Sequence, residues 1–207
     1  MKLEKLYGIA IAIFAAIYSN TLYAQTDSAP PSIPGEWEFS VFAGHESLDS
    51  EAAWLEYIED NAWNIGVTAD YAKGRWLTSL GLTFVNYRDD AGFSQRTRDG
   101  YGNVSNSDST ASGMVLSFAF GPKWHFGENQ NVMVFTQAGL GLMIDSSRGI
   151  PNCSNCYEED IDINSGGFAK VGILRNSASA GAFGISYAQY LSGDMKSTLN
   201  FIWSTTY

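Results

Sequence analysis

The last nine residues of the chain, Leu199–Tyr207 with the sequence LNFIWSTTY, decide the fold. Every second position of this segment holds a large apolar residue except Thr205, and the positions between are small or polar except Ile202. The large residues are Leu199, Phe201, Trp203 and Tyr207. Because successive side chains of a β-strand point to opposite faces, this alternation predicts a strand with one apolar face.

Seven upstream segments repeat the alternation, at 36–44, 63–71, 76–87, 113–125, 132–144, 167–175 and 182–191. The connections after the second, fourth and sixth segments are short, and those after the first, third and fifth are long; the connection after the seventh is also brief. Short turns at one rim and long loops at the other are typical of membrane barrels. We therefore predict an all-β fold: an eight-stranded antiparallel up-and-down transmembrane β-barrel with short periplasmic turns and longer extracellular loops.

The composition also favours a surface that faces lipid. Charged residues make up 16% of the 207 residues, whereas soluble domains carry about a quarter. A soluble sandwich or ligand-holding barrel would turn faces of Gly, Ser, Ala and Thr to water, with few charges to keep it in solution. No run of 18 apolar residues follows Ala24, which argues against spanning helices, and a sheet in lipid must close on itself to satisfy its edges.

Aromatic residues give an independent indication of a membrane barrel. If the odd-numbered strands run upward from the periplasm, six strands carry an outward-facing ring at their lower ends. These residues are Trp37, Tyr71, Trp76, Trp124, Phe183 and Tyr207. Amphipathic rings prefer the boundary between hydrocarbon and headgroups, so we predict that they form an aromatic girdle at the inner membrane interface.

The N-terminus has the layout of a secretory signal peptide. Lys2 and Lys5 precede an apolar stretch at 6–17, and a small residue, Ala24, precedes the expected cleavage site. A membrane anchor is the alternative, but the apolar stretch is shorter than the roughly 20 residues that span hydrocarbon. We predict a signal peptide at 1–24, a Pro-rich periplasmic leader at 25–35 and the barrel domain at 36–207.

These features together resemble the small outer-membrane β-barrel family, of the OmpA transmembrane-domain and OmpX type. In that family the terminal strand is the signal recognised by the barrel-assembly machinery. The resemblance implies this role for Leu199, Phe201, Trp203 and Tyr207, although Thr205 departs from the pattern. It also implies that the protein lies in the outer membrane of a Gram-negative bacterium, in contact with outer-membrane lipid and lipopolysaccharide.

Four charged residues occupy strand positions whose side chains are predicted to point into the barrel: Glu38, Asp70, Lys123 and Lys170. Unpaired charges in a narrow interior are costly, so we expect them to form ion pairs in a network that fills the barrel. The alternative is a gated pore, but an eight-stranded barrel is only wide enough for side chains.

The acidic residues are concentrated in two of the long loops, at 46–61 and 145–164, in a chain of formal net charge −10. Clustered oxygen ligands are suited to divalent cations, which would also bridge lipopolysaccharide phosphates, but the spacing matches no known calcium loop. A solvated acidic surface is the alternative. We therefore assign no metal site and no cofactor, and an acidic surface argues against nucleic acid as a partner.

The long loops carry two further expectations. The segment 54–58 is expected to form a short amphipathic helix in which Trp54, Leu55 and Ile58 share a face. The second long loop, at 88–113, is rich in Gly, Ser, Asn and Asp, and we expect it to be mobile and exposed.

Cys153 and Cys156 are the only cysteines, spaced C-x-x-C in the third long loop. A local disulfide is the expected state in a secreted protein. A redox pair or half of a zinc site are the alternatives, but the first needs a thioredoxin-like fold and the second needs two more ligands.

His45 and His125 are candidates for an enzymatic site, because some eight-stranded barrels modify lipids with His and Ser. His45 is expected near the outer rim with Ser146 or Ser147 at a similar level, and His125 near the inner rim. A general base must lie within hydrogen-bond reach of its nucleophile, and the sequence alone does not show such a pair. We predict a non-enzymatic protein of envelope structure or surface interaction; a narrow channel and a lipid-modifying enzyme are the alternatives.

Overall fold

The computed structural model describes residues 35–98, 102–127, 129–151, 153, 155–177 and 181–205. The predicted signal peptide and all of the predicted leader except Gly35 lie outside these residues, as does Tyr207. The predictions made for them therefore remain predictions.

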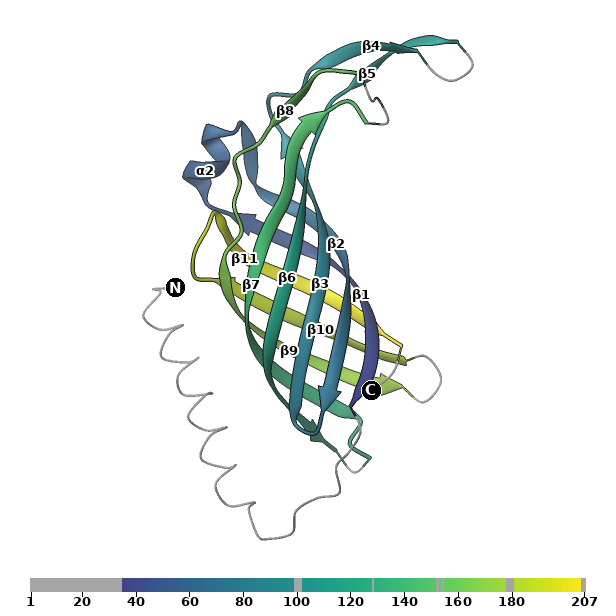
Figure 1. Ribbon diagram of the computed structural model, residues 1–207, viewed down its shortest axis with the longest axis vertical. Helices are drawn as coiled ribbons and strands as arrows, with labels where there is room; N and C mark the ends of the chain where they lie inside the picture. The colour runs from purple at the N-terminus through teal and green to yellow at the C-terminus, as the bar shows by residue number, and fades with distance from the viewer. Residues whose placement is uncertain are drawn as a thin grey trace. The chain divides into compact units, whose positions relative to one another are not determined.

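Eight long strands form a closed antiparallel barrel, drawn in Figure 1. They are β1 (Glu36–Leu48), β2 (Ile58–Lys73), β3 (Trp76–Asp89), β6 (Thr110–Phe126), β7 (Val132–Gly149), β9 (Gly167–Ser177), β10 (Gly181–Tyr190) and β11 (Met195–Ser204). Each of these strands pairs with the next one in the chain, and β11 pairs with β1 to close the sheet. The predicted fold class is confirmed, although several strands extend beyond the predicted bounds at the end that carries the long connections, here called the loop end; the opposite end is the turn end.

The register of the strands fixes the tilt of the barrel. A row of paired residues that starts at Trp37 passes once around the sheet and returns to β1 at Ser47, ten residues farther on (47 − 37). With about 3.3 Å per residue and about 4.8 Å between strands, a shift of this size over eight strands tilts them by roughly 40° from the barrel axis.

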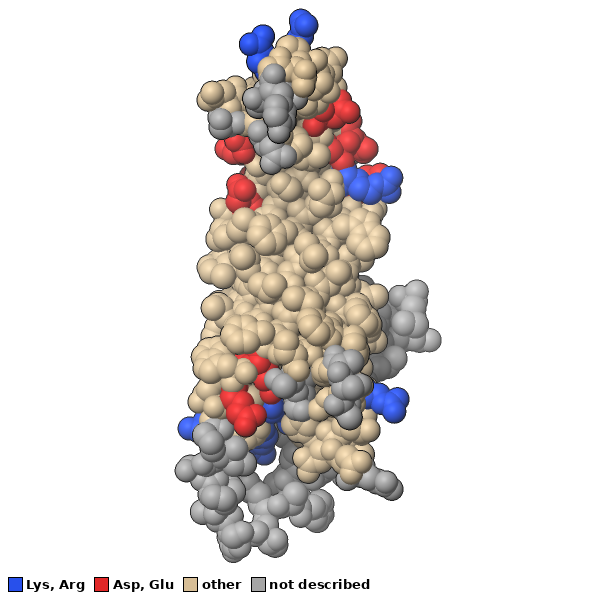
Figure 2. Space-filling model, turned by 90° about the vertical axis from the view of Figure 1, so that its right-hand side faces the viewer, with Lys and Arg blue, Asp and Glu red and all other residues tan. Residues whose placement is uncertain are grey.

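Large apolar side chains cover the outside of the wall. Phe39 on β1, Leu80 on β3 and Phe118 on β6 are 60%, 52% and 53% exposed. The other five strands also expose such residues, for example Val67, Leu140, Ile173, Ile185 and Phe201. Figure 2 shows a wide band of the wall without Lys, Arg, Asp or Glu, and charged residues gather toward its two ends. The apolar faces point outward, as the alternation predicted.

Among the described residues, no helix is both long enough and apolar enough to cross a membrane.

The interior holds more apolar volume than the sequence suggested. A buried cluster near the turn end includes Leu77, Phe135, Leu174 and Ile202. A second cluster at the loop end combines strand residues with loop residues, which include Ala53, Ile58, Ile161 and Ile163. Polar side chains lie between these two clusters, so the interior is layered rather than uniformly polar.

Inward-facing glycines create the space for the interior rings. Phe42 pairs across strands with Gly66, and Phe135 pairs with Gly172. A Cβ atom on Gly66 would lie 2.3 Å from Cζ of Phe42, and one on Gly172 would lie 2.2 Å from Cζ of Phe135. Large and small side chains therefore alternate between neighbouring strands, which fills the narrow interior without strain.

Two of the long loops differ from their expected structure. The helix α2 (Ser50–Leu55) buries Ala53, whereas Trp54 and Leu55 are exposed and Ile58 belongs to β2 and is buried. The expected shared face of Trp54, Leu55 and Ile58 is therefore wrong, because a helix this short reaches the core only through Ala52 and Ala53. The second long loop contains a hairpin of β4 (Ser94–Arg98) and β5 (Val104–Asp108).

Candidate functional site

The predicted interior charges lie inside the barrel but do not pair with one another. Glu38, Asp70 and Lys123 are buried, and Lys170 lines the central cavity. Among the ion pairs of the described residues, none joins these four side chains. The expected ion-pair network is therefore wrong for this part of the chain.

Hydroxyl groups take the place of the expected cations. Asp70 accepts hydrogen bonds from Oγ1 of Thr68 at 3.0 Å, from Oγ of Ser40 at 3.4 Å and from Oγ of Ser79. Ser79 in turn accepts a 2.7 Å hydrogen bond from Nε2 of Gln137. Nζ of Lys170 lies 5.6 Å from the ring centroid of Phe135, a cation–π distance. Nearby hydroxyl groups thus satisfy Asp70, and the Phe135 ring lies close to Lys170. Oε2 of Glu38 is buried without a hydrogen-bond partner.

The central cavity is small, and both polar and apolar side chains line it. Its volume is about 70 Å³, and Glu46, Asp70 and Lys170 are among its lining residues. Oε2 of Glu46 accepts a 2.8 Å hydrogen bond from Nδ2 of Asn64, and Oε1 accepts a 2.7 Å bond from Oγ1 of Thr198. A cavity of this size holds only a few water molecules, and an apolar cluster lies on each side of the polar layer.

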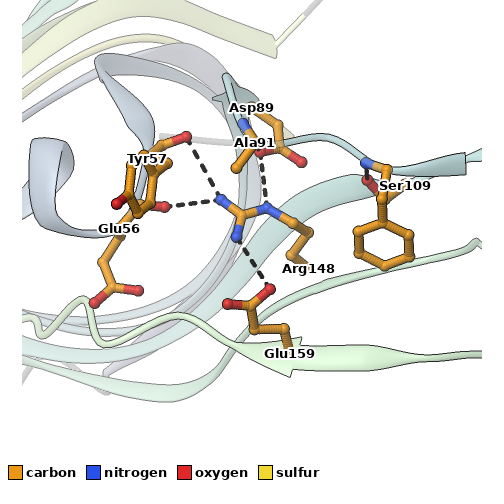
Figure 3. A network of polar contacts seen from close by, with 8 residues as sticks. Glu56, Tyr57, Asp89, Ala91, Ser109, Arg148 and Glu159 are labelled. Atoms are coloured by element: carbon orange, nitrogen blue, oxygen red, sulfur yellow. Dashed lines mark hydrogen bonds and ion pairs between the residues drawn. The ribbon is translucent and has the colours of Figure 1, made fainter.

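The loop end has a buried cationic centre that the sequence analysis missed. Arg148 on β7 is 2% exposed. Its Nε atom donates to Oδ1 of Asp89 at 2.8 Å, and its Nη1 atom lies 3.5 Å from Oε2 of Glu159 on β8 (Glu158–Asp160), as Figure 3 shows. Its Nη2 atom donates to the backbone oxygen of Glu56 at 2.8 Å and lies 3.5 Å from that of Tyr57. One side chain thus joins the segment after α2, the end of β3, the end of β7 and β8.

The sequence contained a weak signal for this centre. Arg148 is the one basic residue in the acidic segment 145–164. A lone base among many carboxylates is an obvious pairing partner, but its contacts lie 59 and 92 residues away along the chain. They become visible only once the barrel register brings β3, β7 and the α2 segment together.

The N-terminus of α2 is held by a capping aspartate. Asp49 accepts hydrogen bonds from the backbone N–H groups of Glu51 at 3.0 Å and Ala52 at 3.2 Å. Nζ of Lys196 lies 2.7 Å from its other carboxylate oxygen. The hydrogen bond with Lys196, followed by those with Ala52 and Glu51, lowers the pKa of Asp49 below its usual value.

Several loop carboxylates are already engaged within the protein. Glu59 pairs with Arg88 at 2.9 Å, and Asp49 and Asp89 have the partners described above. No group of three or more His, Cys, Asp or Glu side chains in the described residues is arranged to hold a metal ion. The acidic loops therefore provide no preformed cation site in this part of the chain.

The two cysteines and the two histidines are placed as follows. Cys153 and Cys156 form a disulfide with a Cα–Cα distance of 5.5 Å. His45 lies on the outside of β1 between Trp63 and Leu199 in the pairing. Ser146 and Ser147 lie on β7, and three strands separate β7 from β1 in either direction around the barrel, so the structure does not bring them to His45. His125 lies near the turn end of β6, opposite Met133.

The described aromatic residues of the predicted girdle all lie at the turn end. Trp37 is paired with Tyr71 and their ring centroids are 5.2 Å apart, whereas Trp76 stacks on Phe120 at 5.0 Å. Trp124 lies near the end of β6, and Phe183 near the start of β10. In the terminal strand, Leu199, Phe201 and Trp203 are exposed on the outer wall.

No protein-family model matches the chain, and no curated protein sequence matches it. Among solved structures, one that is similar is Ail, the attachment invasion locus protein of Yersinia pestis, in complex with the heparin analogue sucrose octasulfate. The TM-score is 0.46 at 13% sequence identity, and the alignment covers 83% of this chain and 97% of that one. Similarity of fold does not carry a binding activity from one chain to another.

Proposed function

We propose that this chain is an outer-membrane β-barrel protein without enzymatic activity, which contributes to envelope structure or surface interaction through the loops at its loop end. One observation carries the proposal: the closed sheet turns its large apolar side chains outward on all eight strands. Water does not stabilise such a wall, whereas acyl chains do. Because the sheet is closed, no strand edge leaves its backbone N–H and C=O groups unpaired in lipid, which cannot form hydrogen bonds with them.

The height of the apolar wall supports this location. On β2 the outward-facing rings of Tyr71 and Trp63 are eight residues apart (71 − 63). At about 3.3 Å per residue and a tilt of roughly 40°, their levels differ by about 20 Å, near the ~25 Å apolar band of outer-membrane barrels. The girdle then lies at the periplasmic interface and the loop end outside the cell.

The interior supports a filled barrel over a channel. Apolar clusters lie on both sides of the polar layer, and the cavity between them holds about 70 Å³. A conducting pore needs a continuous polar path, so we expect planar bilayers that contain the protein to show no stable current. Variants Lys123→Ala and Lys170→Ala are expected to be equally silent, and a steady current from any of the three proteins contradicts the filled barrel.

The partners follow from the location. We propose that outer-membrane lipid and lipopolysaccharide contact the wall, that the barrel-assembly machinery recognises the terminal strand, and that divalent cations interact weakly with the acidic loops. The signal peptide is cleaved before assembly in this proposal.

A gel-mobility experiment tests the proposed location. The mature chain, folded in detergent, is run unheated and heated on a denaturing gel. A closed outer-membrane barrel is expected to migrate faster before heating than after. A mature chain that stays soluble and monomeric without detergent contradicts the proposal. Lipid A mass spectra of cells with and without the protein are expected to be identical, and a new modification would show an enzyme.

A further inference from the structure

An exposed surface with two large apolar side chains lies on α2 at the loop end; it is here called the α2 patch and is formed by Glu51, Trp54 and Leu55. Trp54 is 72% exposed and Leu55 is 60% exposed, and Tyr57, just after the helix, is 64% exposed. Among the described residues, no ring contact or ion pair covers any of these side chains. Figure 1 shows α2 at the upper rim, on the outside of the barrel.

The protein holds this patch in place by contacts at both ends of α2. Asp49 caps the N-terminus of α2 and is itself bound by Lys196. Arg148 donates to the backbone oxygen of Glu56 directly after the helix. A six-residue helix is unstable on its own, so these tertiary contacts, together with the buried Ala53, determine its position. A helix whose backbone is already held in place loses little backbone entropy on binding, which favours a recognition surface.

The arrangement of the patch selects the chemistry of its partner. Glu51 is three residues before Trp54 and four before Leu55, so the three residues share one exposed face of the helix. No described residue forms an ion pair with Glu51. A carboxylate on the same face as an indole and a branched aliphatic group complements a Lys or Arg side chain, whose methylenes pack on the apolar groups while its charge meets Glu51 and the ring face.

The same arrangement disfavours acyl chains as the occupant. Insertion of Trp54 and Leu55 into hydrocarbon would take Glu51 with them, and burying an unpaired carboxylate is costly. Ser47 is the last residue of β1 that pairs with β2 and lies before α2. His45 pairs with Trp63, whose ring marks the upper edge of the apolar band. At about 3.3 Å per residue and a tilt of roughly 40°, the Cα atom of Ser47 lies about 5 Å above that of His45. The helix α2 therefore begins above the apolar band.

We propose that the α2 patch binds a Lys- or Arg-bearing segment of a partner protein at the cell surface. This inference rests on the proposed function, because it requires the loop end to face outward. The surface is small, so the expected affinity is in the micromolar range that is typical of weak, transient contacts. Trp54 supplies most of the contact area, and Glu51 supplies the preference for a positive charge.

The test uses the mature chain folded into zwitterionic phosphatidylcholine nanodiscs. The probe is a fluorescent twelve-residue peptide of Lys, Ser and single Leu residues, and a matched peptide carries Glu at each Lys position. We expect the Lys peptide to bind and the Glu peptide not to bind, as measured by fluorescence anisotropy against empty nanodiscs. Variants Glu51→Gln and Trp54→Ala are each expected to weaken binding at least tenfold, and carbodiimide is expected to couple the peptide to Glu51.

Tyr157→Ala is the matched control, because Tyr157 is also a largely exposed ring, at 60%, on another loop and is followed by Glu158. It is expected to leave the affinity unchanged. No binding of the Lys peptide, equal binding of the Glu peptide, or an equal loss in the control overturns the inference. A variant that keeps Trp54 as its only Trp tests whether acyl chains occupy the patch instead. Quenching of Trp54 fluorescence by lipids brominated in their acyl chains would show that the patch inserts into the membrane. The heat-dependent gel shift, measured on the same samples, separates these outcomes from failure of the proposed location.

Discussion

Nε of Arg148 lies 2.8 Å from Oδ1 of Asp89, and the side chains of the two residues are only 3% and 9% exposed. The pair joins the ends of β7 and β3 at the point where the loop segments leave the barrel. Because the same guanidinium also binds the backbone after α2, this contact determines where the loops stand on the rim.

Replacement of Arg148 by Ala is expected to destabilise the protein by about 3–5 kcal/mol, since it leaves the Asp89 carboxylate buried without its partner. The measurement is urea unfolding in lipid vesicles, followed by tryptophan fluorescence. Protease cleavage near α2 is expected to increase as well, because the backbone oxygen of Glu56 loses its donor.

Arg88→Ala is the control for this prediction. Arg88 pairs with Glu59 at 2.9 Å, but its side chain is 62% exposed. An exposed pair contributes about 0–1 kcal/mol, so this variant is expected to unfold almost as the wild type does. If both variants lose the same stability, the burial of Arg148 is not what makes it important.

The strands could be predicted from the sequence, whereas the filling of the barrel could not. Alternation along one strand reveals which side chains face outward, and Phe39, Leu80 and Phe118 all lie where it placed them. The interior depends on pairs between strands, such as Phe42 with Gly66. A glycine 24 residues from a ring (66 − 42) becomes its neighbour only when the register is known.

The contacts of the charged residues were unpredictable for the same reason. The alternation along β2 predicted that Asp70 points into the barrel. It did not reveal that the hydroxyl groups of Ser40 and Ser79, on the two neighbouring strands, donate hydrogen bonds to its carboxylate. Composition also did not reveal that the Gly- and Ser-rich segment 88–113, predicted to be mobile and exposed, contains the β4–β5 hairpin, whose residues are mostly exposed. Cross-strand hydrogen bonds such as that between Thr97 and Ser107 stabilise this hairpin despite its polar sequence.

The cap of α2 is expected to weaken in acid. Because the pKa of Asp49 is lowered in the folded protein, its contribution is fully present above the unfolded pKa of about 3.9 and is lost as the pH falls through the lower folded value. Hydrogen exchange at the amides of Glu51 and Ala52 is therefore expected to accelerate, relative to amides of the barrel strands, only below about pH 4.

Asp49→Asn separates the charge from the cap. Asparagine still accepts hydrogen bonds from the helix N-terminus, but it cannot pair with Lys196. The variant is expected to lose the acid dependence and to keep most of the amide protection at neutral pH. Unchanged acid dependence would assign the effect to another carboxylate.

Removal of the disulfide is expected to leave the barrel nearly as stable as before. Cys153 and Cys156 are three residues apart, and closing so short a loop removes little entropy from the unfolded chain. The double variant Cys153→Ser/Cys156→Ser is expected to show the same urea midpoint and the same gel shift as the wild type. A lower midpoint would mean that the bridge supports β8 and its contact with Arg148.

The glycines that face interior rings give the sharpest test of the packing. A Cβ atom on Gly172 would lie 2.2 Å from Phe135, so Gly172→Ala is expected to destabilise the barrel by roughly 1–3 kcal/mol through overpacking. Because the clash is with one ring, the double variant Gly172→Ala/Phe135→Leu is expected to recover part of the loss, and urea unfolding of the four proteins in the cycle measures this coupling. Gly149→Ala is the control, since its nearest neighbour would be Cγ of Glu158 at an ordinary 3.5 Å. Additive losses in the cycle would show that Gly172 is required by the backbone rather than by the ring, and the layered filling of the interior would then need another explanation.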